Sequence, residues 1–284
     1  MSVAGVPNSP QGPFGSGLIS AHAAGASRIS GVRPVEVLAD GATPIDTLMD
    51  RASEALVKTQ YFDAIDFSLR ALQRAIHKRD WEHVARITMP LQEARRQIRQ
   101  LACDAGKTFV LRTLPARGTT IEPGCYLLEP PMIGLDGKTF RDMARARKVP
   151  VLALVKEPTT SAGKWPIVGV GTGQFENVVA RVQVEPPASL AGYAGSLAQT
   201  DAKLLPDAAW FQMTLEALGD AAIRKVRAEW PAAHRVEDLA EYLDAVPDHE
   251  KLSQALAAAA KEAVVAPAPV SLRRRPYFDD PHSF

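Results

Sequence analysis

The residue pattern changes character at Gly106, and this change divides the chain into a helical part and a part that contains strands. From about residue 45 up to Gly106, apolar and small side chains recur every three or four residues, the spacing that places them on one face of an α-helix. After Gly106, short runs rich in Val, Ile and Leu are bounded by Gly and Pro, which is typical of β-strands. We therefore expect both helices and a sheet within this chain.

Residues 43–105 are predicted to form amphipathic helices. Thr43-Pro44 supplies a helix N-cap followed by a proline at the first helical position. The negative charge of Asp46 interacts favourably with the positive end of the helix dipole. Apolar side chains then recur at helical spacing in four stretches, 48–56, 65–76, 81–88 and 91–101. Pro90 either begins a fourth helix or kinks a longer one.

Residues 106–185 are predicted to form a small α/β module. Residues 138–148 are expected to be helical, and strand-like runs occupy 125–128, 149–155, 167–170 and 178–184. A strand, helix, strand unit places its two strands parallel to each other. The last two runs are linked across 171–174 as in a hairpin. The module should therefore contain a parallel pair and an antiparallel pair of strands.

The other segments complete the predicted organisation. Residues 1–42 are rich in Gly and Pro and are expected to form a disordered leader, 186–206 a linker and 265–284 a disordered tail. Helical periodicity returns in 207–264, in three predicted helices. The predicted fold class is a mixture of α+β and α/β, with N-terminal helical hairpins, a small central sheet module and C-terminal helices.

Small residues in the first helical region fall where two helices of a hairpin would cross closely. Leu48 is followed by Ala52 four positions on, by Ala64 twelve further along and by Ala71 seven beyond that. This spacing resembles a tetratricopeptide repeat, within about residues 45–105, with a second and divergent copy from Trp81. The resemblance implies a protein-interaction role in which a concave groove holds a partner peptide. A generic pair of antiparallel helices is the alternative.

Composition limits the partners that we expect. The chain has 33 Lys and Arg against 32 Asp and Glu, so no long-range field attracts nucleic acid or an anionic membrane. No apolar stretch approaches the roughly 20 residues of a membrane-spanning helix. Cys103 and Cys125 are too few for a disulfide framework. We expect a cytoplasmic protein that binds a protein or peptide partner, or a second copy of itself, and that needs no cofactor.

A repeated dipeptide marks the candidate ligand site. Glu129-Pro130 and Glu157-Pro158 follow the two strands that are predicted to be parallel. Ligands collect beyond the carboxyl ends of parallel strands, so two carboxylates there suit a metal ion or a shared proton. The alternative is that each proline ends a strand and each glutamate faces water. No third acid or histidine accompanies the pair.

Other patterns favour structural roles. The glycines at 169–173 lack the G-x-G-x-x-G spacing of a dinucleotide site, and the histidines form no metal-binding pair, so no metal site is predicted. Asp248-His249-Glu250 is interpreted as the capped start of a helix. Two basic helical faces favour contact with an anion or RNA when taken alone, although the balanced charge favours solvated faces; they contain Arg95, Arg96 and Arg99, and Arg141, Arg145, Arg147 and Lys148.

The sequence therefore predicts a non-enzymatic interaction or scaffold protein that acts through helical hairpins. The alternative is an α/β enzyme, or a nucleotide- or metal-binding module, that uses Glu129 and Glu157. No catalytic residue is identified.

Overall fold

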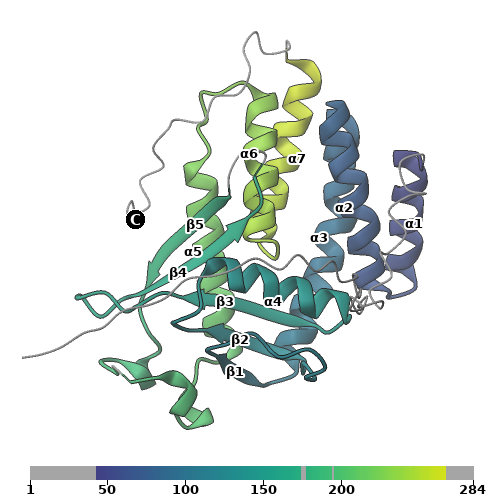
Figure 1. Ribbon diagram of the computed structural model, residues 1–284. Helices are drawn as coiled ribbons and strands as arrows, with labels where there is room; N and C mark the ends of the chain where they lie inside the picture. The colour runs from purple at the N-terminus through teal and green to yellow at the C-terminus, as the bar shows by residue number, and fades with distance from the viewer. Residues whose placement is uncertain (1–42, 174–176, 194, 267–284) are drawn as a thin grey trace, which may run out of the picture. The chain divides into compact units, whose positions relative to one another are not determined.

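The computed structural model describes residues 43–173, 177–193 and 195–266. The predicted leader at 1–42, most of the predicted tail and residues 174–176 lie outside these ranges. The described residues form seven α-helices and a five-stranded mixed sheet, with helices at both ends, so the predicted fold class is confirmed (Figure 1). None of the described helices combines the length and the apolar character that crossing a membrane requires.

Three helices rather than four form the N-terminal region: α1 (Ile45–Val57), α2 (Tyr61–Lys78) and α3 (Trp81–Asp104). Pro90 lies inside α3, which continues on both sides of it. Ala52, Ala64 and Ala71 are each 0 % exposed, and Figure 1 shows the three helices side by side. The predicted helical hairpin is therefore confirmed, whereas the resemblance to a repeat family stays a prediction.

The five strands lie in the order in which they occur along the chain: β1 (Thr108–Leu111), β2 (Gly124–Leu128), β3 (Val151–Lys156), β4 (Trp165–Gly171) and β5 (Val178–Val184). The first three strands are parallel, and β4 and β5 are antiparallel to their neighbours. Helix α4 (Gly134–Ala146) joins β2 to β3. The predicted strand, helix, strand unit and the antiparallel pair are confirmed, and β1 was not predicted.

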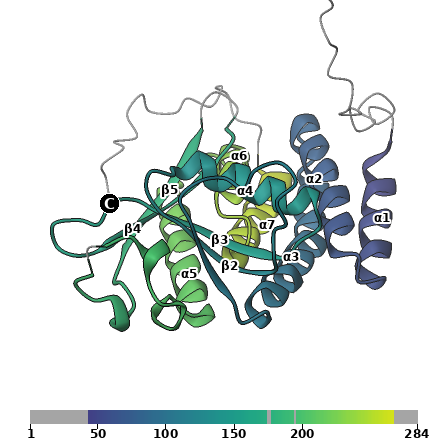
Figure 2. The same ribbon diagram turned by 60° about the horizontal axis from the view of Figure 1, so that its bottom comes forward.

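The two faces of the sheet pack against different helices because successive side chains of a strand point to opposite faces. Leu127 and Leu154 belong to a large apolar core that includes residues of α3 and the C-terminal helices, which are α5 (Ala208–Lys225), α6 (Ala232–Ala245) and α7 (Glu250–Val265). Leu128 and Val155 belong to a smaller core around Phe140 of α4. Figure 2 shows α4 on one side of the sheet and α5 on the other.

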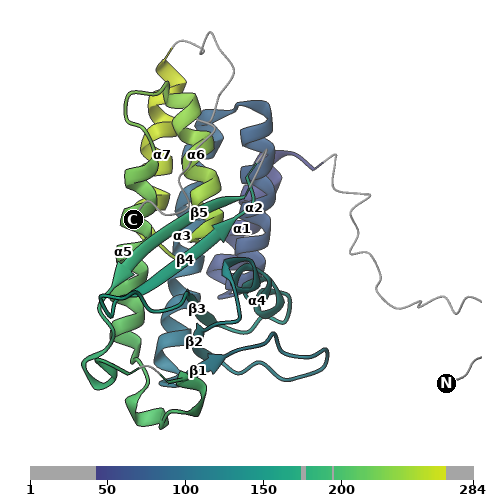
Figure 3. The same cartoon turned by 60° about the vertical axis from the view of Figure 1, so that its left-hand side comes forward.

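The predicted linker at 186–206 is packed onto the rest of the fold. It contains three short 3₁₀ helices, at Ala188–Leu190, Leu197–Gln199 and Ala202–Leu204. Leu190 and Leu197 are each only 2 % exposed. Figure 3 shows α6 and α7 on the same side of the molecule as α5, next to α3. Buried charge lies at the carboxyl ends of the parallel strands, with Glu129 and Lys156, and in the space between α2, α3, α4 and α6, with Arg95.

Candidate functional site

Glu129 lies buried at the carboxyl end of β2, so the interpretation that it faces water is wrong. It is 4 % exposed, and its carboxylate accepts hydrogen bonds from Ser196 Oγ and from the backbone nitrogens of Leu197, at 3.0 Å, and Ala198, at 3.4 Å. Arg112 Nε lies 3.6 Å from the same carboxylate. Glu129 therefore fixes residues 196–198 over the end of the strand.

Glu157 has a separate role from Glu129. Its Oε1 accepts a hydrogen bond from Arg181 Nη2 at 2.7 Å, which joins the end of β3 to β5. A cavity of about 520 Å³ at the strand ends is lined by Glu129 and not by Glu157. The two predicted site residues thus stabilise different parts of the fold, and nothing in their contacts indicates a shared ion or proton.

A buried lysine also faces this strand-end cavity. Lys156 is 8 % exposed, and its Nζ lies 5.1 Å from the centroid of the Trp165 ring. Burial lowers the pKa of Lys156, whereas the negative charge of Glu129 raises it. The lysine, the aromatic ring and the glutamate together explain why this charged end of the sheet tolerates burial.

His249 was interpreted as part of a helix cap, and its contacts agree with that role. Its Nδ1 accepts a hydrogen bond from the backbone nitrogen of Leu252 at 3.2 Å, so the proton of the neutral ring sits on Nε2. Nε2 lies 3.4 Å from carboxylate oxygens of Glu216 and Asp220. These three residues form a group that resembles a metal site. A metal ion at this group would bind the lone pair of Nε2, so the ring proton would have to sit on Nδ1. Nδ1 cannot carry that proton while it accepts the hydrogen bond from Leu252, so the contacts of His249 do not fit a metal ligand.

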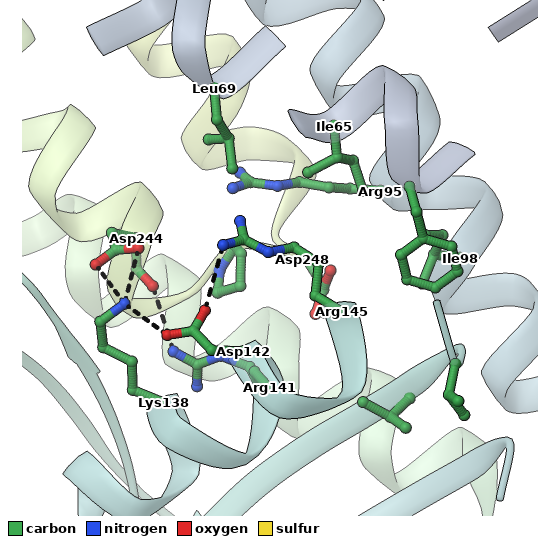
Figure 4. Close-up of a pocket in the computed structure, with 14 residues that line it drawn as sticks. Ile65, Leu69, Arg95, Ile98, Lys138, Arg141, Asp142, Arg145, Asp244 and Asp248 are labelled. Atoms are coloured by element: carbon green, nitrogen blue, oxygen red, sulfur yellow. Dashed lines mark hydrogen bonds and ion pairs between the residues drawn. The ribbon is translucent and has the colours of Figure 1, made fainter. Parts of the chain in front are cut away.

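The second region is a small cavity between α2, α3, α4 and the α6–α7 connection, which we call the arginine pocket. It has a volume of about 90 Å³, and its charged side chains are those of Arg95, Lys138, Arg141 and Arg145 and of Asp142, Asp244 and Asp248. The rest of its wall is mostly apolar and includes Ile65, Leu69 and Ile98 (Figure 4).

Arg95, on α3, is the most buried of these charged groups and has no hydrogen-bonding partner for Nη1 among the described residues. The residue is 7 % exposed, and the part of the chain that the structure describes supplies it with no ion pair. No dashed line reaches Arg95 in Figure 4. Burial lowers the pKa of Arg95 to about 10, so the guanidinium still carries its full charge at neutral pH.

Helix α4 brings three further cations to the pocket, Lys138, Arg141 and Arg145, and it packs very close to the sheet. A Cβ atom on Gly137 would lie 2.2 Å from Val155 Cγ2, so only glycine permits this approach. Arg141, one turn later, donates from Nη2 to the carbonyl oxygens of Val170 and Asp244, both at 3.3 Å. Burial lowers the pKa of Arg141 as well.

Two of the three carboxylates are already engaged by other groups. Asp244 accepts a hydrogen bond from the backbone nitrogen of Thr172 at 2.7 Å and lies 3.3 Å from Lys138 Nζ. Asp142 lies 3.4 Å from the same Nζ and 3.6 Å from Arg145 Nη2. Neither carboxylate therefore neutralises Arg95 directly.

Asp248 is the third carboxylate, and its pKa is raised by burial. The positive charges of Arg95, Arg141 and Arg99 act in the opposite direction and lower that pKa. Its backbone oxygen accepts a hydrogen bond from Arg99 Nη1 at 2.8 Å, which fixes the start of α7 against α3. Asp248 is thus an electrostatic neighbour of Arg95 without a direct contact.

Arg95 lies on the apolar stripe of α3, and the sequence alone contains this pattern. Leu91, Arg95, Ile98 and Ala102 recur at intervals of four, three and four residues, and all four are buried. Leu101, which the predicted stripe contained, is 46 % exposed. An arginine on the apolar stripe of a helix is a buried cation, and the interpretation of Arg95 as part of a solvated face is wrong.

The arginine pocket presents guanidinium N–H donors to a small space, and nearby carboxylates offset the buried charge of Arg95 only in part. Oxygen atoms of an anion are the natural acceptors for such donors. Among known proteins, no family model, no curated protein and no solved structure matches this chain.

Proposed function

We propose that the chain binds a small oxyanion, a phosphate or carboxylate group, in the arginine pocket. The observation that carries the proposal is the buried guanidinium of Arg95, whose Nη1 has no hydrogen-bonding partner among the described residues. A buried ion without a partner costs several kcal/mol, by order of magnitude. An anion that supplies both charge and acceptor oxygens offsets this cost.

The geometry of the guanidinium fits this class of ligand. A planar guanidinium presents parallel N–H groups that match two oxygens of a carboxylate or phosphate. Besides burial, which lowers the pKa of Arg95, the negative charges of Asp248 and Asp244 raise it, and the smaller effects of Arg145 and Arg141 lower it. Four cations and three carboxylates line the cavity, a formal charge of +1, which an anion offsets.

Isothermal titration calorimetry with inorganic phosphate, and separately with acetate, tests this proposal. We expect saturable binding of at least one of them, weakened about tenfold or more by Arg95→Met, since a charge-assisted hydrogen bond contributes about 1.5–3 kcal/mol. Arg96→Met is the matched control, because Arg96 lies on the same helix, is exposed and pairs with Glu93. Binding that Arg95→Met and Arg96→Met weaken equally, or no binding of either anion, would contradict the proposal.

A protein-interaction role through the helical region is the second candidate. It is favoured by two exposed apolar side chains there, Val57, which is 85 % exposed, and Met89, which is 75 % exposed. Sedimentation velocity of the purified chain tests self-association: Met89→Glu should shift an oligomer toward the monomer. Met213→Glu, on α5, is the control, because Met213 is 67 % exposed outside the helical region. A monomer at all concentrations rules out self-association.

A further inference from the structure

A larger groove adjoins the arginine pocket between α2 and α6. Its volume is about 680 Å³, and its apolar lining comes from Leu69, Leu72 and Ile76 of α2 and from Ala240 of α6. The three α2 residues are spaced by three and four positions, so they form one face of the helix. Leu69 and Ile76 are only partly buried, although both pack against the core. They therefore leave apolar surface open to the groove.

Three residues line both the groove and the arginine pocket: Leu69, Lys138 and Asp244. The two spaces are therefore neighbours, with an apolar side chain from α2 on one side of their junction and the Lys138–Asp244 ion pair on the other. A ligand that occupies both spaces passes between Leu69 and this ion pair and extends along α2.

The groove limits what the rest of the ligand can carry. Charged side chains of both signs line it, and Asp244 among them is paired with Lys138. A second anionic group on the ligand would give up its hydration against the apolar face of α2. An uncharged, apolar body is the part that the α2 face stabilises.

From the shared lining residues and the apolar face of α2 we infer that the ligand is an amphiphile with one anionic group. Its single phosphate or carboxylate group binds at Arg95, and its alkyl or aryl body lies in the groove against Leu69, Leu72 and Ile76. This inference rests on the proposed function and narrows its ligand class, since inorganic anions would occupy only the pocket.

Calorimetric titrations with n-alkyl phosphates and n-alkanoates of two to six carbons test this inference. Each buried methylene should strengthen binding about fourfold. A second phosphate at the far end of the six-carbon chain should remove most of that gain. Inorganic phosphate and acetate are titrated in parallel, and they report on the pocket alone.

Two groove variants separate the apolar contribution from the anion site. Ile76→Thr and Ala240→Glu should each flatten the dependence on chain length while leaving the affinity for inorganic phosphate or acetate unchanged. If the unmodified chain binds inorganic phosphate or acetate but its affinity does not depend on alkyl chain length, the inference is overturned and the proposed function stays intact. The same steep dependence in both variants also overturns it. Loss of all anion binding in the unmodified chain contradicts the proposed function itself.

Discussion

Asp248 and Arg95 interact electrostatically across the arginine pocket, yet no hydrogen bond or ion pair joins them. The negative charge of Asp248 raises the pKa of Arg95, and the positive charge of Arg95 lowers that of Asp248. Because the two charged groups do not touch, their attraction only partly offsets the cost of removing both ions from water. The anion that we propose would offset the rest of this cost.

The first prediction concerns stability without a ligand. Replacing Arg95 by Met removes a buried charge that Asp248 and Asp244 offset only in part, and it keeps most of the side-chain volume. In anion-free buffer, the free energy of unfolding measured with urea should be unchanged or rise by about 1 kcal/mol or more. Arg99→Met is the comparison on the same helix. Arg99 donates to the backbone oxygen of Asp248 and pairs with Glu250, so its loss should cost about 1–3 kcal/mol. Equal destabilisation by both changes would show that Arg95 already has a partner.

The second prediction concerns the pH dependence of anion binding. Burial raises the pKa of Asp248, so acidification protonates this carboxylate earlier than an exposed aspartate and removes a negative charge that faces the anion. The anion to titrate is sulfate, because its charge does not change between neutral pH and the pKa of Asp248. The affinity for sulfate should rise as the pH falls toward the pKa of Asp248. Asp248→Asn should bind sulfate roughly threefold to tenfold more tightly at neutral pH and show a flatter profile. A profile that Asp248→Asn leaves unchanged would assign the pH dependence to another group.

The third prediction concerns the contact between α1 and α3. His83 Nε2 lies 3.0 Å from Asp46 Oδ1 and His83 Nδ1 lies 2.7 Å from Asp80 Oδ2, and the hydrogen bond with Asp46 is the main reason that the pKa of His83 is raised. Because the folded state holds this proton more tightly, the stabilisation is complete below about pH 6.5 and is lost as the pH rises through the folded-state pKa. The melting temperature of His83→Gln should lie below that of the unmodified chain at low pH and approach it at high pH. His77→Gln, at an exposed position on α2, should show no such change.

The fourth prediction concerns the segment over the strand ends. Glu129→Gln keeps the shape of the side chain but removes the charge that holds the backbone nitrogens of Leu197 and Ala198, so it should cost about 1–3 kcal/mol. Amide hydrogen exchange at residues 195–199 should accelerate. Glu185→Gln is the control, since Glu185 is 75 % exposed in its side chain and pairs only with Lys164 at the surface. An unchanged rate of amide exchange at 195–199 would show that Glu129 does not position this segment.

The sequence predicts the elements of this fold well because most of them have strong periodicity. The apolar stripes of α1, α2 and α5 to α7 are long, and β2 to β5 are rich in branched side chains. β1 was not predicted because its four residues, Thr108–Leu111, are too few to establish alternation. The segment 186–206 looked like a linker because its burial depends on Leu190 and Leu197, which are isolated apolar residues without any period.

The candidate sites were harder to predict, because each depends on where the elements pack. Glu129 was identified from its place after a strand, but its partners at 196–198 lie far along the chain. Arg95 belongs to a helix on which Arg96 is exposed and Arg99 is only partly buried, so the burial of Arg95 follows from the packing of α3 against other elements. The convergence of α3, α4 and the start of α7 around one cavity is a tertiary property that no local pattern contains.

A crystal soaked in selenate, a tetrahedral oxyanion with a strong anomalous signal, tests anion binding at Arg95 most directly. We expect an anomalous peak in the arginine pocket, within hydrogen-bonding distance of the Arg95 guanidinium, and its loss in Arg95→Met crystals. An empty pocket, with Arg95 paired to Asp248 and selenate bound only elsewhere, would contradict it.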